Sequence, residues 1–242
     1  RLFLNQGNDS DGNPRFIEIT KEAGLEPLGI KAPHVEFQDF DNDGWPDILT
    51  SIVRFKDGKV YPTIFKHTGL KNGIPVYQDF KINDFPTEED IRIENSADFW
   101  DKMIRDGKVM YMAPAPAGDY DNDGRMDIFL PSWWLEAPSQ LLHNETPSGR
   151  WLQVQVAPAD GVNRMGVGAR VNIYKKGKSG NKSKLLGSQD IAVGFGYASG
   201  HQAMAHFGLG KLKKVDVETI LPHGKGSFSK SKVKTNQRIV MP

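Results

Sequence analysis

The sequence predicts an all-β protein. Short apolar runs alternate with clusters of Gly, Pro, Asn and Asp along the whole chain. A strand–turn–strand unit also recurs within the first half, and only one segment, residues 95–107, has the pattern of a helix. Short apolar runs bounded by turn residues are typical of β-sandwiches, barrels and propellers.

Composition narrows the class of protein further. The chain has 242 residues and 27.0 kDa, which suits one or two domains. Its apolar runs are too short to cross a bilayer, so we expect no transmembrane segment. Cysteine is absent, which excludes disulfides and thiolate metal sites. The chain begins at Arg1 without a Met or an apolar signal region, so we expect a piece of a longer precursor whose targeting segment has been removed.

Charge divides the sequence into two halves. Residues 1–140 hold 15 Lys and Arg against 25 Asp and Glu, and residues 141–242 hold 16 against 5. The split predicts two domains, 1–140 and 141–242. The opposite charges either neutralise each other across an internal interface or give the second half a basic face for an anionic polymer. The basic residues form no basic helix and no aromatic stacking platform, which argues against nucleic acid.

The first half contains a repeated unit. Strands are predicted at residues 1–7 and 15–20, and again at 47–53 and 59–69. The segment "TIFKHTGLKNGIPVYQDF" parallels "LFLNQGNDSDGNPRFIEI", which gives a period of about 60–80 residues. A third start follows at residue 140. The predicted helix lies in an insertion at residues 81–112.

The basic half is predicted to be a compact β-sandwich or small barrel. A hairpin tip is expected at 175–184, where the sequence reads "KKGKSGNKSK". The expected strands are 150–156, 168–174, 184–194, 215–222 and 237–242.

Two Asp-rich stretches, "DFDNDGWPD" at 39–47 and "DYDNDGRMD" at 119–127, match in every charged position. Their carboxylates fall at positions 1, 3, 5 and 9: Asp39, Asp41, Asp43 and Asp47, then Asp119, Asp121, Asp123 and Asp127. Alternate residues of a tight loop can converge on one point. The backbone carbonyls at position 7, of Trp45 and Arg125, can add an oxygen, and Gly44 and Gly124 permit the sharp turn. Six to eight oxygen ligands suit Ca²⁺, so we predict two calcium sites.

Two rival interpretations apply to these stretches. An EF-hand needs a bidentate Glu at position 12, where this chain has Thr50 and Leu130. The flanks are also strand-like. The other rival is an Asp-rich turn without metal, whose side chains cap their own backbone.

The repeated unit with its inserted D-x-D-x-D-G-x-x-D loop resembles the FG-GAP/VCBS repeats of integrin-α-type β-propellers, and this resemblance implies that the loop holds calcium. The basic half resembles the ASPIC/UnbV domain, which follows such repeats in cartilage acidic protein-like proteins. The matching stretches are "NRMGVGARVNIY" at 163–174, "GFGYASGHQAMAHFGLG" at 194–210 and "VDVETILPHGK" at 215–225. One departure is Leu221, where that family usually has tryptophan. Two units and a partial third are too few to close a propeller, so we expect further repeats upstream.

The resemblance implies a calcium-stabilised binding or adhesion module without a catalytic role, secreted, at the cell surface or periplasmic. Its partner would be a protein or a glycan. One alternative is a carbohydrate-active enzyme, which would use the acidic run at 88–90 and the pair Trp133 and Trp134. We expect core packing for at least one of these tryptophans, and a packed, hydrogen-bonded state for His206. Another alternative is binding of anionic glycans by the basic half, through Lys211, Lys213 and Lys214.

Overall fold

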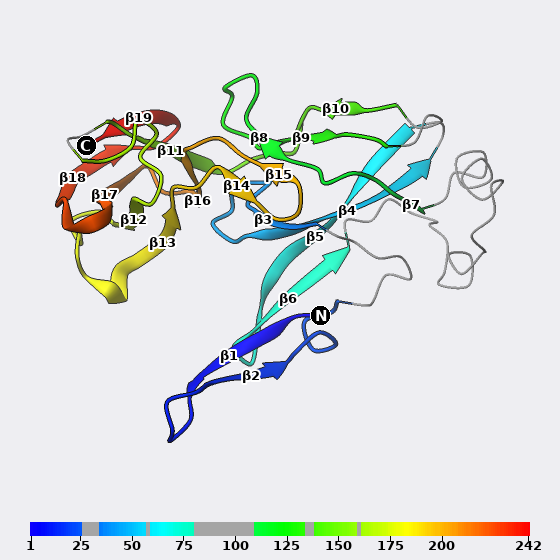
Figure 1. Cartoon of the computed structure of the whole chain (residues 1–242), viewed down its shortest axis with the longest axis horizontal. Coiled ribbons are helices and arrows are strands. Elements are labelled where there is room, and N and C mark those ends of the chain that lie inside the picture. Colours follow the sequence, from blue (N-terminus) through cyan, green and yellow to red (C-terminus); the bar gives the residue numbers. More distant parts are fainter. Residues whose placement is uncertain (26–33, 57–58, 80–108, 134–137, 159–160) are drawn as a thin grey trace. The chain divides into compact units, whose positions relative to one another are not determined.

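The computed structural model describes residues 1–25, 34–56, 59–79, 109–133, 138–158 and 161–242 (Figure 1). These residues form strands and two short 3₁₀ turns, so the all-β prediction is confirmed. The chain divides into two compact units. Unit 1 comprises residues 1–37, 46–115 and 130–139, and unit 2 comprises 38–45, 116–129 and 140–242. The predicted helix lies outside the described residues.

Unit 1 is built from seven strands among the described residues. They are β1 (Phe3–Asn8), β2 (Pro14–Glu18), β3 (Val35–Gln38), β4 (Asp47–Lys56), β5 (Lys59–Lys71), β6 (Ile74–Asp79) and β7 (Val109–Tyr111). Strands β4, β5, β6 and β7 pair antiparallel. Strands β1 and β2 form a hairpin. Strands β3 to β6 form a sheet in sequence order, and β7 pairs with β4. The strands predicted in the first half are therefore present.

The core of unit 1 contains fully buried residues of β4, such as Leu49, Ile52 and Val53. Ala23, Ile48, Phe65 and Tyr77 form a buried cluster. The backbone N–H of Tyr77 donates to the carbonyl of Ala23, which holds the turn after β2 against β6.

Unit 2 contains the remaining strands and both 3₁₀ turns. They are β8 (Ala117–Gly118), β9 (Asp127–Leu130), β10 (Gln140–Leu142), β11 (Arg150–Val156), β12 (Arg170–Lys175), η1 (Lys182–Lys184), β13 (Leu185–Asp190), β14 (Gly194–Phe195), β15 (Ser199–Gly200), β16 (Ala205–Gly210), β17 (Lys214–Ile220), η2 (Pro222–Gly224), β18 (Ser227–Lys234) and β19 (Gln237–Met241). Four sheets result, with strand orders β10-β9-β8, β16-β11-β19, β13-β12-β17-β18 and β14-β15.

Two of these sheets form a β-sandwich. Alternate residues of β11 face inward, with Leu152, Val154 and Val156 almost completely buried. They pack in one cluster with Val171 of β12 and Val217 of β17, which belong to the other sheet. The predicted sandwich is therefore present, and no sheet closes into a barrel among the residues that the structure describes.

Unit 2 also takes in two segments from the acidic half. Residues 38–45 and 116–129 contain most of both Asp-rich stretches, and they cluster with the sandwich that follows them. The assignment of residues 1–140 to FG-GAP/VCBS-like repeats stays a prediction.

Candidate metal centre

The first Asp loop is closed by its own backbone amides. Asp39 accepts from the N–H groups of Asp43 and Gly44, at 3.0 and 2.8 Å. The Oδ1 of Asp43 accepts from the N–H of Trp45 at 2.8 Å. Carboxylate oxygens of Asp39, Asp41 and Asp43 lie within 4.8 Å of one another. Three of the predicted ligands are thus gathered at one point.

The second loop repeats this pattern. Asp119 Oδ2 accepts from the N–H of Gly124 at 3.0 Å, and Asp123 Oδ1 accepts from the N–H of Arg125 at 2.8 Å. Here two overlapping groups of possible ligand atoms each lie within 4.8 Å. One comes from Asp119, Asp121 and Asp127, and the other from Asp121, Asp123 and His143. Two hydrogen bonds are thus equivalent in the two loops, whereas the N–H of Asp43 donates to Asp39 and the N–H of Asp123 donates to Asp121.

Left-handed backbone makes each turn possible. Asn42 and Asn122, at position 4 of the two loops, have φ of 56° and 65°. Gly44 and Gly124, at position 6, have φ of 102° and 87°. Asn and Gly adopt this region more readily than other residues, which explains the shared N-D-G sequence.

One buried oxygen supports a cation in the second loop. Asp119 is only 2% exposed, and its Oδ1 has no hydrogen-bond partner among the described residues. A buried carboxylate oxygen without a donor is costly unless a cation neutralises it. The available donors are oxygens, which hard cations such as Ca²⁺ prefer. The residues therefore fit the predicted ion.

The pKa of Asp127 is raised within this cluster of carboxylates. Burial raises it, and the nearby Asp121 carboxylate raises it further. The N–H groups of Asn144 and Tyr120, which donate to Asp127 at 2.8 and 3.1 Å, offset only part of this effect. A cation among these carboxylates would act in the opposite direction, because positive charge favours the ionised form.

The remaining predicted ligands have other surroundings. Asp47 belongs to unit 1, in β4, where its Oδ1 accepts from the N–H of His67 at 2.8 Å. Asp123 pairs with the guanidinium of Arg125. Asp47 and Asp123, and the carbonyls of Trp45 and Arg125, stay predicted ligands.

Sequence reasoning missed several polar residues at the loops. His143 Nε2 lies 3.1 Å from Asp121 Oδ2 and 3.7 Å from Asp123 Oδ2. The side-chain amide of Asn144 donates to the carbonyls of Phe40 and Met126 at 2.8 and 3.0 Å, one in each loop. Both residues directly follow β10, which begins at the third start of the repeated unit. Two polar residues at that place in the sequence were the feature from which they could have been predicted.

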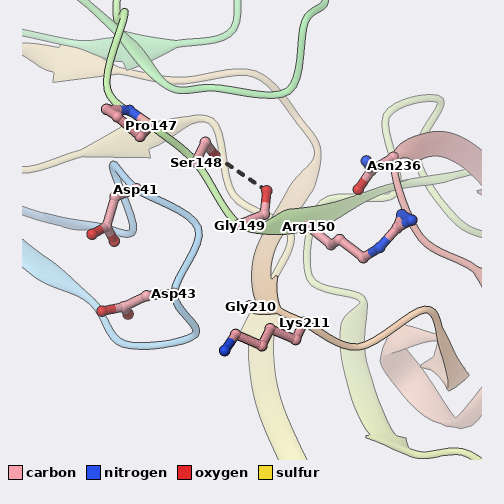
Figure 2. A pocket seen from close by; sticks show the side chains of 9 residues that line it. All are labelled: Asp41, Asp43, Pro147, Ser148, Gly149, Arg150, Gly210, Lys211 and Asn236. Atoms are coloured by element: carbon pink, nitrogen blue, oxygen red, sulfur yellow. Dashed lines mark hydrogen bonds between the residues drawn. The ribbon is translucent and has the colours of Figure 1, made fainter.

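An open cleft borders the first loop (Figure 2). Asp41 and Asp43 line one side of it, and Arg150 and Lys211 line the other. Two acidic and two basic residues therefore line the cleft. In Figure 2 the side chain of Lys211 extends toward Asp43, and that of Arg150 extends toward Asn236.

The histidine prediction is confirmed: His206 is 6% exposed and hydrogen-bonded through its ring. Burial lowers the pKa of His206 from its ordinary 6.5 to about 4, so the ring is neutral at physiological pH. Among the residues proposed for an enzyme, Trp133 is 48% exposed. Trp134 and the acidic run at 88–90 lie outside the described residues.

Comparison with known proteins supports the second part of the resemblance. Residues 159–241 match the family described as ASPIC and UnbV. The chain is also similar to cartilage acidic protein 1 from Homo sapiens (33% identity over 229 residues) and from Mus musculus (26% over 261 residues). Each match covers 93% of this chain, which spans 29% and 38% of the two relatives. No helix among the described residues is long and apolar enough to cross a membrane.

Proposed function

We propose that this chain is a calcium-stabilised, non-catalytic binding module of an extracellular protein. The observation that carries the proposal is the pair of loops with equivalent hydrogen bonds, each gathering three carboxylates within 4.8 Å. Bound Ca²⁺ would neutralise these carboxylates and hold each loop in its turn. The similarity to cartilage acidic protein 1 supports a secreted location.

Within this proposal the residues divide into two roles. Asp39, Asp41 and Asp43 would hold one ion, and Asp119, Asp121 and Asp127 the other. Each ion binds the folded state, so it adds to stability by mass action, about 2.7 kcal/mol at a hundredfold excess over its dissociation constant. Ordered loops would then present a fixed surface to a protein or glycan partner.

Calorimetric titration of chelator-stripped protein with CaCl₂ tests the proposal. We expect two sites in the wild type, and the loss of one site in each of Asp41→Ala and Asp121→Ala. Melting temperature should rise with calcium in the wild type and rise less in each variant, because each ion binds only the folded loop.

Asp11→Asn is the matched control for acidic turns. In the β1–β2 turn, Asp9 Oδ1 already accepts from the N–H groups of Asp11 and Asn13, both at 2.9 Å. The aspartate of this turn already binds its own backbone amides. Asp11→Asn should therefore leave the calcium titration unchanged. Heat and melting curves that are the same with and without calcium in the wild type would show that the Asp loops are bare turns.

The cleft favours a second candidate function, the binding of anionic glycans. Arg150 and Lys211 supply the positive charge. Asp41 and Asp43 oppose it unless a cation neutralises them, so calcium should strengthen the attraction.

Retention on immobilised heparin tests this candidate. We expect Arg150→Ala with Lys211→Ala to elute at lower salt than the wild type, and calcium to raise the salt needed for elution of the wild type. Lys182→Ala with Lys184→Ala removes the same charge from η1 and is the control. Equal loss of retention in the two double variants would show that heparin responds to the net charge of the protein. It would then reject the cleft as the glycan-binding site.

A further inference from the structure

Three buried polar side chains connect the two Asp loops. Asn42 is the fourth residue of the first loop, Gln153 lies in β11 and His206 lies in β16. Asn42 and Gln153 are 0% exposed and His206 is 6% exposed. None of them is a predicted ligand. Buried polar groups of this kind are retained where their hydrogen bonds are satisfied, so their partners indicate their role.

Asn42 connects the first loop to the second and to β16. Its Nδ2 donates to the carbonyl of Gly124 and to the Oγ of Ser148, both at 2.8 Å. Its Oδ1 is therefore the acceptor toward His206 Nε2, at 2.7 Å. This arrangement places the proton of the neutral His206 ring on Nε2 and leaves Nδ1 as an acceptor.

Gln153 completes the connection to the second loop. Its Nε2 donates to Asp119 Oδ2 at 2.7 Å and faces His206 Nδ1 at 3.4 Å. Its Oε1 accepts from Nε and Nη2 of Arg238 at 3.0 and 2.8 Å, which fixes the orientation of the amide. Asp119 Oδ2 thus accepts from Gln153 and Gly124, and Oδ1 has no hydrogen-bond partner among the described residues.

We infer that Asn42, His206 and Gln153 are positioning residues that couple the two Asp loops, so that ordering one loop favours the ordered state of the other. Asn42 is hydrogen-bonded to His206, His206 faces Gln153, and Gln153 donates to Asp119. No side chain of the three can therefore reorient without breaking a buried hydrogen bond. Both loops share the free-energy cost of ordering these three hydrogen-bonded side chains. A cation bound at one loop therefore lowers that cost for the other. The part of this inference that concerns cations rests on the proposed function.

Asn122 provides a matched control within the chain. It occupies the same position in the second loop as Asn42 in the first, and it has the same left-handed backbone. It is exposed, whereas Asn42 is buried. Asn42→Gly and Asn122→Gly therefore make the same change in equivalent turns, and only the first removes a link between the loops.

Amide hydrogen exchange in the presence of chelator tests the coupling without metal. Gln153→Met removes the contact with Asp119 in the second loop and with His206, and it touches no residue of the first loop in the hydrogen bonds described. We expect exchange of the Asp43 and Gly44 amides, in the first loop, to rise by tenfold or more. Asn42→Gly should likewise speed exchange of the Gly124 amide, and Asn122→Gly should leave Asp43 and Gly44 unchanged.

His206→Phe is the second variant, in case Gln153→Met unfolds. It keeps a ring in the buried site and removes both nitrogens, so it should give the same increase at Asp43 and Gly44. Exchange changes confined to the second loop in folded Gln153→Met, or absent from the first loop in folded His206→Phe, would overturn the coupling.

Calorimetry with CaCl₂ provides the second test. Asp41→Ala should weaken binding at the second loop several-fold. This effect should be smaller when Gln153→Met is also present, because only the direct links through Asn42 and Asn144 then remain. Gln153→Met alone should weaken the second site by about tenfold or more, as substitutions beside metal ligands commonly do. An Asp41→Ala effect of equal size in both backgrounds would overturn the coupling. Absence of calcium binding in the wild type would reject the proposed function and leave the exchange result to decide the coupling.

Discussion

Gly124→Ala should lower the free energy of unfolding by about 3 kcal/mol or more, a sum of backbone strain and overpacking. Gly124 has φ of 87°, where alanine is strained. An added Cβ would also lie 1.8 Å from Cε2 of Trp151, whose indole covers the turn. Chemical denaturation in the presence of chelator measures the loss. Calcium affinity at the second loop should fall as well, since the turn carries Asp119 and Asp121.

Gly44→Ala separates the two contributions. Gly44 has φ of 102°, but its added Cβ would meet only the carbonyl of Gly208, at 3.7 Å. It should cost about 1 kcal/mol, from backbone strain alone. Equal losses in Gly44→Ala and Gly124→Ala would mean that the contact with Trp151 does not restrict the second loop.

Lowering the pH should destabilise the protein through His206. The folded protein keeps this ring neutral down to about pH 4, whereas the unfolded chain takes up the proton near pH 6.5. The unfolded state therefore binds more protons between these values, and the free energy of unfolding falls as the pH drops through this window. The total loss is about 3 kcal/mol, and above pH 6.5 this residue adds no pH dependence. Denaturant titrations across the window, with chelator, measure it.

His206→Gln is the comparison for the pH experiment, because it removes the titrating ring. Gln153 links His206 to the charged groups Asp119 and Arg238, and burial raises the pKa of Asp127. The difference between wild type and variant cancels contributions that the two proteins share. A pH dependence that is the same in both proteins would contradict the assignment to His206.

Local sequence determined two kinds of feature: strands with a clear apolar–polar pattern, and the turns of the Asp loops. The segment 150–156 alternates apolar and polar residues from Leu152 to Val156 and forms β11 with the predicted bounds. The Asp–Asn–Gly spacing closes each loop through hydrogen bonds between residues at most five apart, such as Gly124 to Asp119. Such short-range geometry depends on side-chain type and backbone preference, which are written in the sequence.

Sequence patterns were weaker where strands are polar or rich in glycine. Strand β18, with the sequence "SFSKSKVK", buries only Val233 and is held by pairing with β17. Strand β16 ends in "GLG", which has the composition of a turn. An added Cβ on Gly208 would lie 1.8 Å from Asp39 Oδ2, so this glycine allows the first loop to approach the strand. These strands depend on neighbours that a local pattern does not contain.

The sequence by itself determined that this is an all-β chain with two acid-rich loops of equal spacing. The tertiary structure alone decided what surrounds those loops. It joined Asn42 to His206, 164 residues away, and Gln153 to Asp119, 34 residues away. It also placed Asp47 in a different unit from Asp39. The physical reason is range: hydrogen bonds within a turn follow from spacing, whereas a buried polar partner is selected by packing of distant strands, which no short stretch encodes.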